Sequence, residues 1–133
     1  MTQLITDQGF VVDDWATDYA PLAAARNAIA IDVASDAHPD DIPLADSLQM
    51  IRVDFPHAAD GRGFTLARQL RLRGYTGRLR ARGHVIADQY AMVRRSGFDE
   101  VEIPDDLAAR QPQDQWLARA NWKDHDYQSR LRG

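Results

Sequence analysis

Cysteine is absent from the chain. This absence excludes disulfide bonds, thiolate metal sites, cysteine-ligated iron–sulfur clusters and dithiol redox chemistry carried by the polypeptide itself. A run of about 18 uncharged apolar residues is also lacking, and the N-terminus carries Asp7, Asp13 and Asp14 where a secretory signal needs basic residues before an apolar stretch. We therefore expect a soluble, cytoplasmic protein with no membrane partner.

Sequence signatures of common cofactor sites are missing too. Gly61-Arg62-Gly63 begins like a dinucleotide-binding loop, but the third glycine position is Leu66, and arginines stand about twenty residues further on, where an acid is needed. No Ser/His/Asp arrangement or nucleophile elbow is found. The histidines have no short paired spacing that suits a metal ion; they are His38, His57, His84 and His125. We expect neither a metal nor a cofactor.

The length and composition suit one globular domain. The chain has 133 residues, 44% hydrophobic and 27% charged, enough for a single core. We divide the predicted domain, residues 1–133, into an N-terminal hairpin and lead-in (1–20), a core of βα units (21–110) and an aromatic tail (111–133). In this tail, Trp116, Trp122 and Tyr127 either pack on their own domain, which we favour, or contact a partner.

Charge is unevenly distributed along the chain. Residues 1–60 hold eleven acidic residues against Arg26 and Arg52, whereas residues 61–87 hold seven arginines and no acid. Such a basic stretch could bind nucleic acid, but the net charge is −4 and the pI about 5.4. We favour compensation between the two halves and expect no nucleic-acid partner.

Short runs with period-two alternation predict four strands, at Ile29–Val33, Ile51–Phe55, Leu79–Arg82 and Glu100–Ile103. Two β-prone runs on either side of Asp7-Gln8-Gly9 predict the N-terminal hairpin. Helices are expected at Leu22–Ala28, Leu44–Leu48, Gly63–Arg73 and Val85–Ser96, the last of which ends at Gly97. Strand and helix in alternation are typical of parallel βαβ units, so the predicted fold class is α/β with a small parallel sheet.

One side of this sheet is predicted to be charged. A parallel sheet covered on both faces has continuously apolar strands. Here seven ionic residues recur at alternate strand positions: Asp32, Arg52, Asp54, Arg80, Arg82, Glu100 and Glu102. We therefore expect helices mainly on one face and a charged face like the inside of half a βα barrel. Pairing of opposite charges on neighbouring strands is favoured over a ligand site.

The connection after the second strand is a candidate oxyanion site, because open α/β sheets bind ligands at the carboxyl ends of their strands. It contains Asp60, Gly61, Arg62 and Gly63. Free N–H groups at the helix start, two glycines and the arginine could cradle a small oxyanion. Equally, Asp60 could cap the helix while the glycines shape a turn.

The end of the third strand offers further candidates, Arg80, Arg82, His84, Asp88 and Gln89. If the second and third strands are neighbours, a rim formed by His57, Arg62, Arg82 and His84 could bind sulfite, sulfate or phosphate. His57 or His84 would then be the candidate catalytic residue for proton transfer. Surface histidines without a catalytic role are the interpretation that we favour.

Several motifs in combination point to a family. They are Asp13-Asp14-Trp15, Phe55-Pro56, Asp60-Gly61-Arg62-Gly63-Phe64, Leu79-Arg80-Ala81, Gly83-His84-Val85 with Asp88-Gln89, and Arg95-Ser96-Gly97-Phe98-Asp99. Together they resemble the uncharacterised bacterial domain-of-unknown-function family 934, over nearly all of the chain up to about Ile103. The resemblance implies an oxidoreductase context, namely assimilatory sulfite reduction and cysteine synthesis, and brings no established active site.

The resemblance also has two departures. Many members of the family carry cysteine at the position of Ser96 and an acid at the position of His84. This implies that neither a thiol nor an acid at these positions is essential in the present chain, which weakens an intrinsic redox role.

Two functions are therefore expected as alternatives. The first is an accessory protein without a redox group of its own, which binds sulfite reductase components through the charged face and the aromatic tail. The second is a small oxyanion-binding domain or enzyme that uses the arginine and histidine rim. A homodimer formed through the polar face is compatible with both.

Overall fold

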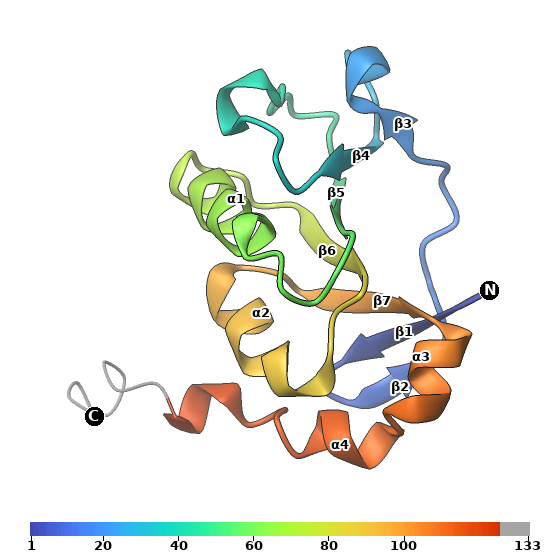
Figure 1. The fold of residues 1–133 in the computed structure, drawn as a ribbon. Helices are drawn as coiled ribbons and strands as arrows, with labels where there is room; N and C mark the ends of the chain where they lie inside the picture. Colours follow the sequence, from blue (N-terminus) through green and yellow to red (C-terminus); the bar gives the residue numbers. More distant parts are fainter. Residues whose placement is uncertain (126–133) are drawn as a thin grey trace.

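The computed structural model describes residues 1–125. At its centre lies a seven-stranded sheet in the order β2-β1-β7-β6-β5-β4-β3 (Figure 1). The four predicted strands are confirmed as parallel neighbours in sequence order: β4 (Ala30–Ala34), β5 (Met50–Phe55), β6 (Arg78–Gly83) and β7 (Glu100–Pro104). The α/β class is confirmed with them.

The N-terminal hairpin is confirmed and extends the sheet. Strands β1 (Thr2–Thr6) and β2 (Gly9–Val11) pair antiparallel with each other. Strand β1 also pairs antiparallel with β7, which no local sequence signal indicated, so the sheet is mixed. At the opposite end, the two-residue strand β3 (Ala20–Pro21) is parallel to β4.

Both edges of the sheet are protected against pairing with another chain. On β2, the backbone N–H of Phe10 donates to Oε1 of Gln113 at 2.8 Å. On the other edge, β3 is very short and contains Pro21, which has no N–H to donate. Short edges, proline and side-chain covers are known devices against edge-to-edge association.

Helices α1 (Arg62–Leu72) and α2 (Tyr90–Ser96) lie on one face of the sheet (Figure 1). The apolar stripe of α1, Leu66, Ala67 and Leu70, is buried in the same core as the alternate residues of β5. Burial of each leucine contributes about 1.5–3 kcal/mol. As the pattern predicted, Leu72 lies outside this stripe and is exposed, and Gly97 ends α2 with a φ of 116°.

Three other helix predictions need correction. The expected helix at Leu44–Leu48 is wrong: that segment holds one turn, closed by the N–H of Leu48 and the carbonyl of Ala45, because a segment so short cannot nucleate a helix alone. The same connection forms the 3₁₀ turn η2 (Pro39–Asp41) instead. The helix expected at Leu22–Ala28 is only the 3₁₀ turn η1 (Leu22–Ala24). Before α2, the chain first makes η3 (Ala87–Gln89).

The described part of the aromatic tail packs on its own domain, as favoured. It forms α3 (Asp105–Arg110), α4 (Gln113–Leu117) and the 3₁₀ turn η4 (Trp122–His125). Trp116 is 1% exposed, its ring centroid lies 6.0 Å from that of Tyr90, and its Nε1 donates to the carbonyl of Gln111. Tyr127, the third aromatic residue of the predicted tail, lies outside the described residues. Within residues 1–125 no helix has the length and apolarity needed to cross a membrane.

Candidate functional site

The charged side chains form two rows across the parallel strands. The register places Asp32, Arg52, Arg80 and Glu100 in the first row, and Ala34, Asp54, Arg82 and Glu102 in the second. The second row is nearer the carboxyl ends of the strands. Predicted cross-strand pairing is confirmed at Arg52, whose Nε lies 2.6 Å from Oδ1 of Asp32. We call the side of the sheet that carries both rows the charged face.

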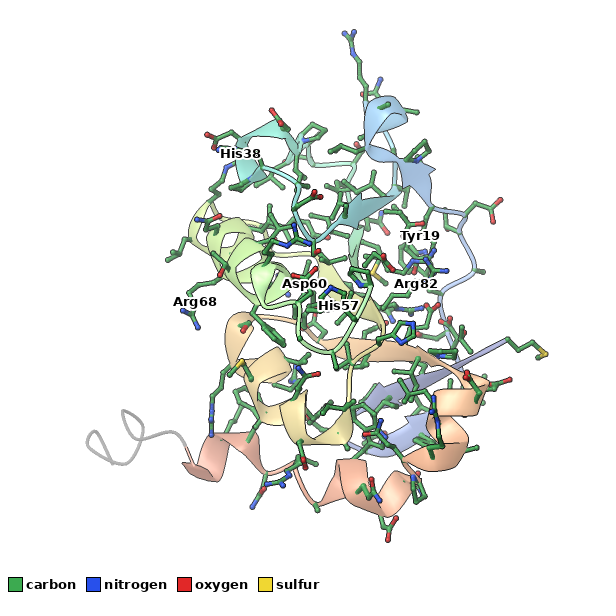
Figure 2. The ribbon with its side chains drawn as sticks, viewed as in Figure 1. Tyr19, His38, His57, Asp60, Arg68 and Arg82 are labelled. Atoms are coloured by element: carbon green, nitrogen blue, oxygen red, sulfur yellow. The ribbon has the colours of Figure 1, made fainter. Side chains whose placement is uncertain are left out.

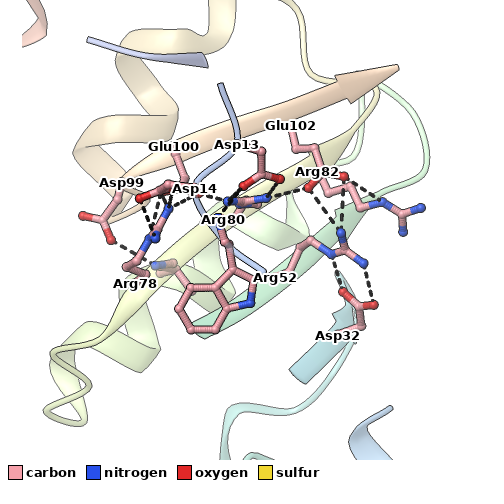
Figure 3. Close-up of polar contacts among 12 residues, drawn as sticks. Asp13, Asp14, Asp32, Arg52, Arg78, Arg80, Arg82, Asp99, Glu100 and Glu102 are labelled. Atoms are coloured by element: carbon pink, nitrogen blue, oxygen red, sulfur yellow. Dashed lines mark hydrogen bonds and ion pairs between the residues drawn. The ribbon is translucent and has the colours of Figure 1, made fainter. Parts of the chain in front are cut away.

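Arg80 is the centre of the first row. Its side chain is 0% exposed, and its guanidinium donates to Glu100 at 2.5 Å, to Glu102 at 2.8 Å, and to both oxygens of Asp13 at 2.9 and 3.0 Å (Figure 3). Burial opposes the charge, but these hydrogen bonds and charges outweigh it and raise the pKa of Arg80. Four of its five N–H donors are used. Arg80 was predicted as an anion-binding candidate. It has only one N–H group left to donate to an anion within the described residues.

Residues 12–19, which we call the strap, cover the first row without forming regular secondary structure. Besides Asp13, Asp14 lies 2.8 Å from Nη2 of Arg78, and the Tyr19 ring centroid lies 3.7 Å from Cζ of Arg52. The hydrogen bond from Arg80 lowers the pKa of Asp13, and burial raises the pKa of Tyr19 to about 12. The Trp15 ring centroid lies 5.4 Å from Cζ of Arg78. The strap therefore adds two carboxylates and two aromatic rings to the arginines.

Apolar side chains are also buried on the charged face. Leu4 and Met50 are buried, and the register places them on the charged face, opposite Glu102 and Arg78. Two polar atoms of the strap, Nε1 of Trp15 and the Tyr19 hydroxyl, are buried without a hydrogen-bond partner in residues 1–125. The strap therefore covers the first row of the charged face, and contact with a partner or a second copy through this face stays a prediction.

The second row is more open. Arg82 is 45% exposed, and its ion pairs, 3.6 Å to Glu102 and 4.0 Å to Asp54, are longer than hydrogen bonds. Arg82 and His84 line a cavity of about 260 Å³ together with Asp54 and Glu102. The predicted proximity of Arg82 and His84 is therefore observed. Figure 2 shows Arg82 and Tyr19 on the side of the sheet opposite to Arg68, which lies on the outer surface of α1.

A second cavity, of about 490 Å³, lies on the other side of the Asp54–Arg82 pair. Asp32, Asp36, Asp54 and Arg82 line it together with the apolar residues Pro21, Leu22, Val33, Ala34 and Ala37. Asp36 lies two residues after the end of β4. Sequence reasoning missed this residue, although its place after a strand, at the same edge as the other candidates, was an available signal.

The candidate oxyanion cradle at the start of α1 is already filled by Asp60. This buried carboxylate accepts the backbone N–H of Arg62 at 3.0 Å, the Arg62 guanidinium at 2.8 Å and the hydroxyl of Ser35 at 2.6 Å. These hydrogen bonds, first that from the Arg62 side chain, hold the pKa of Asp60 well below its usual range. Asp60 thus satisfies the first N–H group of α1 locally, from the position before the N-cap residue Gly61.

The two glycines of this connection differ in what they require. A Cβ on Gly63 would lie 2.4 Å from the ring of Phe55, so close packing of α1 on β5 needs glycine there. Gly61 has open space around it and an ordinary φ of −85°. Packing on Phe55 therefore accounts for Gly63, whereas nothing in the surroundings of Gly61 requires a glycine.

Of the remaining candidate site residues, Gln89 and Asp88 contact other parts of the fold, whereas His57 does not. Gln89 joins two connections: its Nε2 donates to the carbonyl of Ala58 at 2.6 Å, and its Oε1 accepts the N–H of Ile86. Asp88 pairs with Arg119 at 3.0 Å. His57 is exposed in the connection that also holds Asp60 (Figure 2), and its side chain has no hydrogen bond within residues 1–125.

The predicted rim thus divides into two places. Arg82 and His84 share a cavity, whereas Arg62 lines a different one, beside Ser35 and Asp36. In the described part of the chain, no group of three or more histidine, aspartate or glutamate side chains is arranged to hold a metal ion.

Comparison with known proteins gives one match. The model of a family described as bacterial protein of unknown function (DUF934) matches residues 30–133. No curated protein and no solved structure matches the chain. The matched segment contains β4 to β7 and hence both charged rows, whereas the strap lies before it.

Proposed function

The chain belongs to the bacterial family of unknown function DUF934, and from this premise we propose that it is a small binding protein of assimilatory sulfite reduction that holds a sulfur oxyanion at Arg82 and His84. The sulfite context comes from the resemblance of its motifs to that family. The observation that carries the proposed site is the exposed Arg82 guanidinium, which lines a cavity and, within residues 1–125, has only ion pairs of 3.6 and 4.0 Å.

The side of the cavity formed by Arg82 and His84 has donors that suit an oxyanion. A guanidinium presents its N–H groups as a planar fork that matches two oxygens of a sulfite, sulfate or carboxylate group. The imidazole of His84 adds a donor from either ring nitrogen, and a positive charge when protonated. The nearby carboxylate of Glu102 is already compensated by Arg80 at 2.8 Å and Arg52 at 3.2 Å, so it opposes an anion less than a free acid would.

Calorimetric titration with sulfite and with sulfate tests the proposed site. We expect Arg82→Ala to weaken sulfite binding at least tenfold, whereas the matched Arg68→Ala should leave it unchanged. Arg68 is exposed on α1 and has no hydrogen bond or ion pair within residues 1–125. His84→Ala should also weaken sulfite binding, whereas the control His57→Ala should leave it unchanged. No heat with the unmodified protein, or equal binding by Arg82→Ala, would refute the site.

Growth of the bacterium tests the proposed context. Deletion of the gene should prevent growth on sulfate as the sulfur source but not growth on cysteine. A plasmid copy that carries Arg68→Ala should restore growth on sulfate, and one that carries Arg82→Ala should not. Normal growth of the deletion strain on sulfate would exclude a required role in sulfite reduction.

Docking to a sulfite reductase component is a second candidate, favoured by the outer surface of the helices. Arg68, Arg95 and Lys123 have no carboxylate partner within residues 1–125, although Arg95 donates to the carbonyl of Trp122. This surface, which includes Lys123 of the tail, replaces the charged face as the proposed contact region. Reductase subunits that co-purify with the unmodified protein should be lost from an Arg68→Glu, Lys123→Glu variant; equal recovery would reject this surface.

A further inference from the structure

We infer that the second charged row binds a small zwitterion, an α-amino acid whose carboxylate pairs with Arg82 and whose ammonium group pairs with Asp54. The inference rests on one part of the proposed function, the assignment of ligand binding to Arg82. It names a ligand class that fits the cavities on both sides of the Asp54–Arg82 pair.

The first argument is the position of this pair. Asp54 and Arg82 are direct neighbours in the parallel register of β5 and β6, and each lines both cavities, of about 260 and 490 Å³. Their side chains are 51% and 45% exposed and approach each other only to 4.0 Å. A ligand with both charges can therefore replace one weak contact by two closer ones, without breaking a buried ion pair.

The second argument is the charge around the larger cavity. Asp32 is compensated by Arg52 at 2.6 Å, but the nearest cations to Asp36 and Asp54 lie at 3.9 and 4.0 Å. Asp36 and Asp54 would attract an ammonium group into this cavity, and they would repel a ligand that carried negative charge alone. A bare oxyanion therefore complements only half of the site.

The third argument is the remaining lining of the larger cavity, which is apolar. Leu22, Val33 and Ala37 provide a surface for a small uncharged side chain, and the volume lies within the range of about 300–1,000 Å³ usual for small-molecule sites. An acidic side chain would meet Asp36. The site should therefore prefer small uncharged amino acids to acidic ones.

The test compares ligands that differ by one charged group. L-alanine carries both charges, propionate lacks the ammonium group and ethylamine lacks the carboxylate; each is titrated by calorimetry alongside sulfite. We expect L-alanine to bind at least tenfold more tightly than propionate or ethylamine, and L-glutamate to bind more weakly than L-alanine.

Two variants test which residue binds each charged group of the ligand. Arg82→Ala and Asp54→Asn should each weaken L-alanine binding at least tenfold, whereas the control Asp46→Asn, on an exposed turn, should not change it. Because Asp54 and Arg82 are about half exposed, both variants should keep the thermal midpoint of the unmodified protein, which shows that they are folded.

The outcomes separate this inference from the proposed function. Sulfite binding that depends on Arg82, with L-alanine no better than propionate, would overturn the zwitterion and leave the oxyanion site intact. L-alanine binding that depends on both residues, without sulfite binding, would support the zwitterion and refute the oxyanion. Binding of neither would refute both.

Discussion

Arg80 and Arg82 lie two residues apart on the same face of β6, yet their surroundings differ completely. Arg80 is 0% exposed, and three carboxylates surround it, so a further anion cannot easily reach its guanidinium. Arg82 is 45% exposed, and its ion pairs in the described part of the chain are all long. Two of the carboxylates at Arg80, those of Glu100 and Glu102, come from β7, and the third, that of Asp13, comes from the strap. Close pairing on both sides makes Arg80 structural, whereas Arg82 can meet a ligand.

The strap itself supplies what a ligand would supply at Arg80. Asp13 presents both carboxylate oxygens to the guanidinium, which is the geometry of a bound oxyanion or carboxylate. Arg82 lies beyond the strap and has no such internal partner. The comparison therefore predicts large effects on stability at Arg80, smaller ones in the strap, and effects mainly on binding at Arg82.

Arg80→Ala should have the largest effect on stability. Removal of the guanidinium leaves Glu100 and Glu102, both buried, with less compensation, although Arg78 and Arg52 still contact them. Loss of one member of a buried ionic network costs about 3–5 kcal/mol, and we expect the lower end of this range. Urea unfolding measures it, and a loss below about 1 kcal/mol would contradict a structural role for the first row.

Asp13→Ala should have an intermediate effect. The Asp13 carboxylate is 41% exposed, so we expect a loss of only about 1 kcal/mol in the free energy of unfolding. Residues 12–19 should also exchange their amide hydrogens faster, because Asp13 ties the strap to β6. Asp18→Ala is the matched control, since Asp18 is an exposed residue of the same strap. Equal exchange in the two variants would show that Asp13 does not hold the strap.

Period-two alternation predicted the strands and the side of the sheet on which each charged residue lies. This succeeded because the face of a strand residue is a local property, set by the backbone itself. The order of the parallel strands followed from the short connections between them. Asp32, Arg52 and Arg80 consequently lie side by side, as the sequence indicates.

The strap could not be predicted in the same way. Its key contact joins Asp13 to Arg80, 67 positions apart. The strap also has no periodic pattern of apolar residues from which a buried side could be predicted. The pairing of β1 with β7 was missed for the same reason, since strand partners distant in sequence leave no local signal. Without the strap, the charged face looks open along its whole length.

The candidate site shows a related limit. From the sequence, Asp60 could cap the helix or leave Arg62 free for an anion. Ser35, which follows β4, also donates to this carboxylate and helps to fix the capping arrangement. A residue from another strand thus contributes to a choice that the local motif leaves open.

Lowering the pH should weaken the strap. Asp13 has a folded-state pKa below its ordinary value of 3.8, chiefly through the hydrogen bond from Arg80. A carboxylate with a lowered pKa stabilises the fold above its unfolded pKa, and this contribution disappears as the pH falls through the folded value. The difference in unfolding free energy between the unmodified protein and Asp13→Ala should therefore be constant near pH 6 and shrink below about pH 4. A difference that grows on acidification would contradict this linkage.

Arg82→Ala should have the smallest effect on stability. Its ion pairs are long and half exposed, and Glu102 keeps Arg52 and Arg80 as partners, so we expect a change within about 0.5 kcal/mol. Urea unfolding of Arg80→Ala and Arg82→Ala under identical conditions makes the contrast direct. Because the two substitutions remove the same group from the same strand face, similar losses would mean that cover by the strap does not distinguish these arginines. A near-neutral Arg82→Ala would show that the fold does not depend on this guanidinium, and that any loss of binding in the variant reports on the site alone.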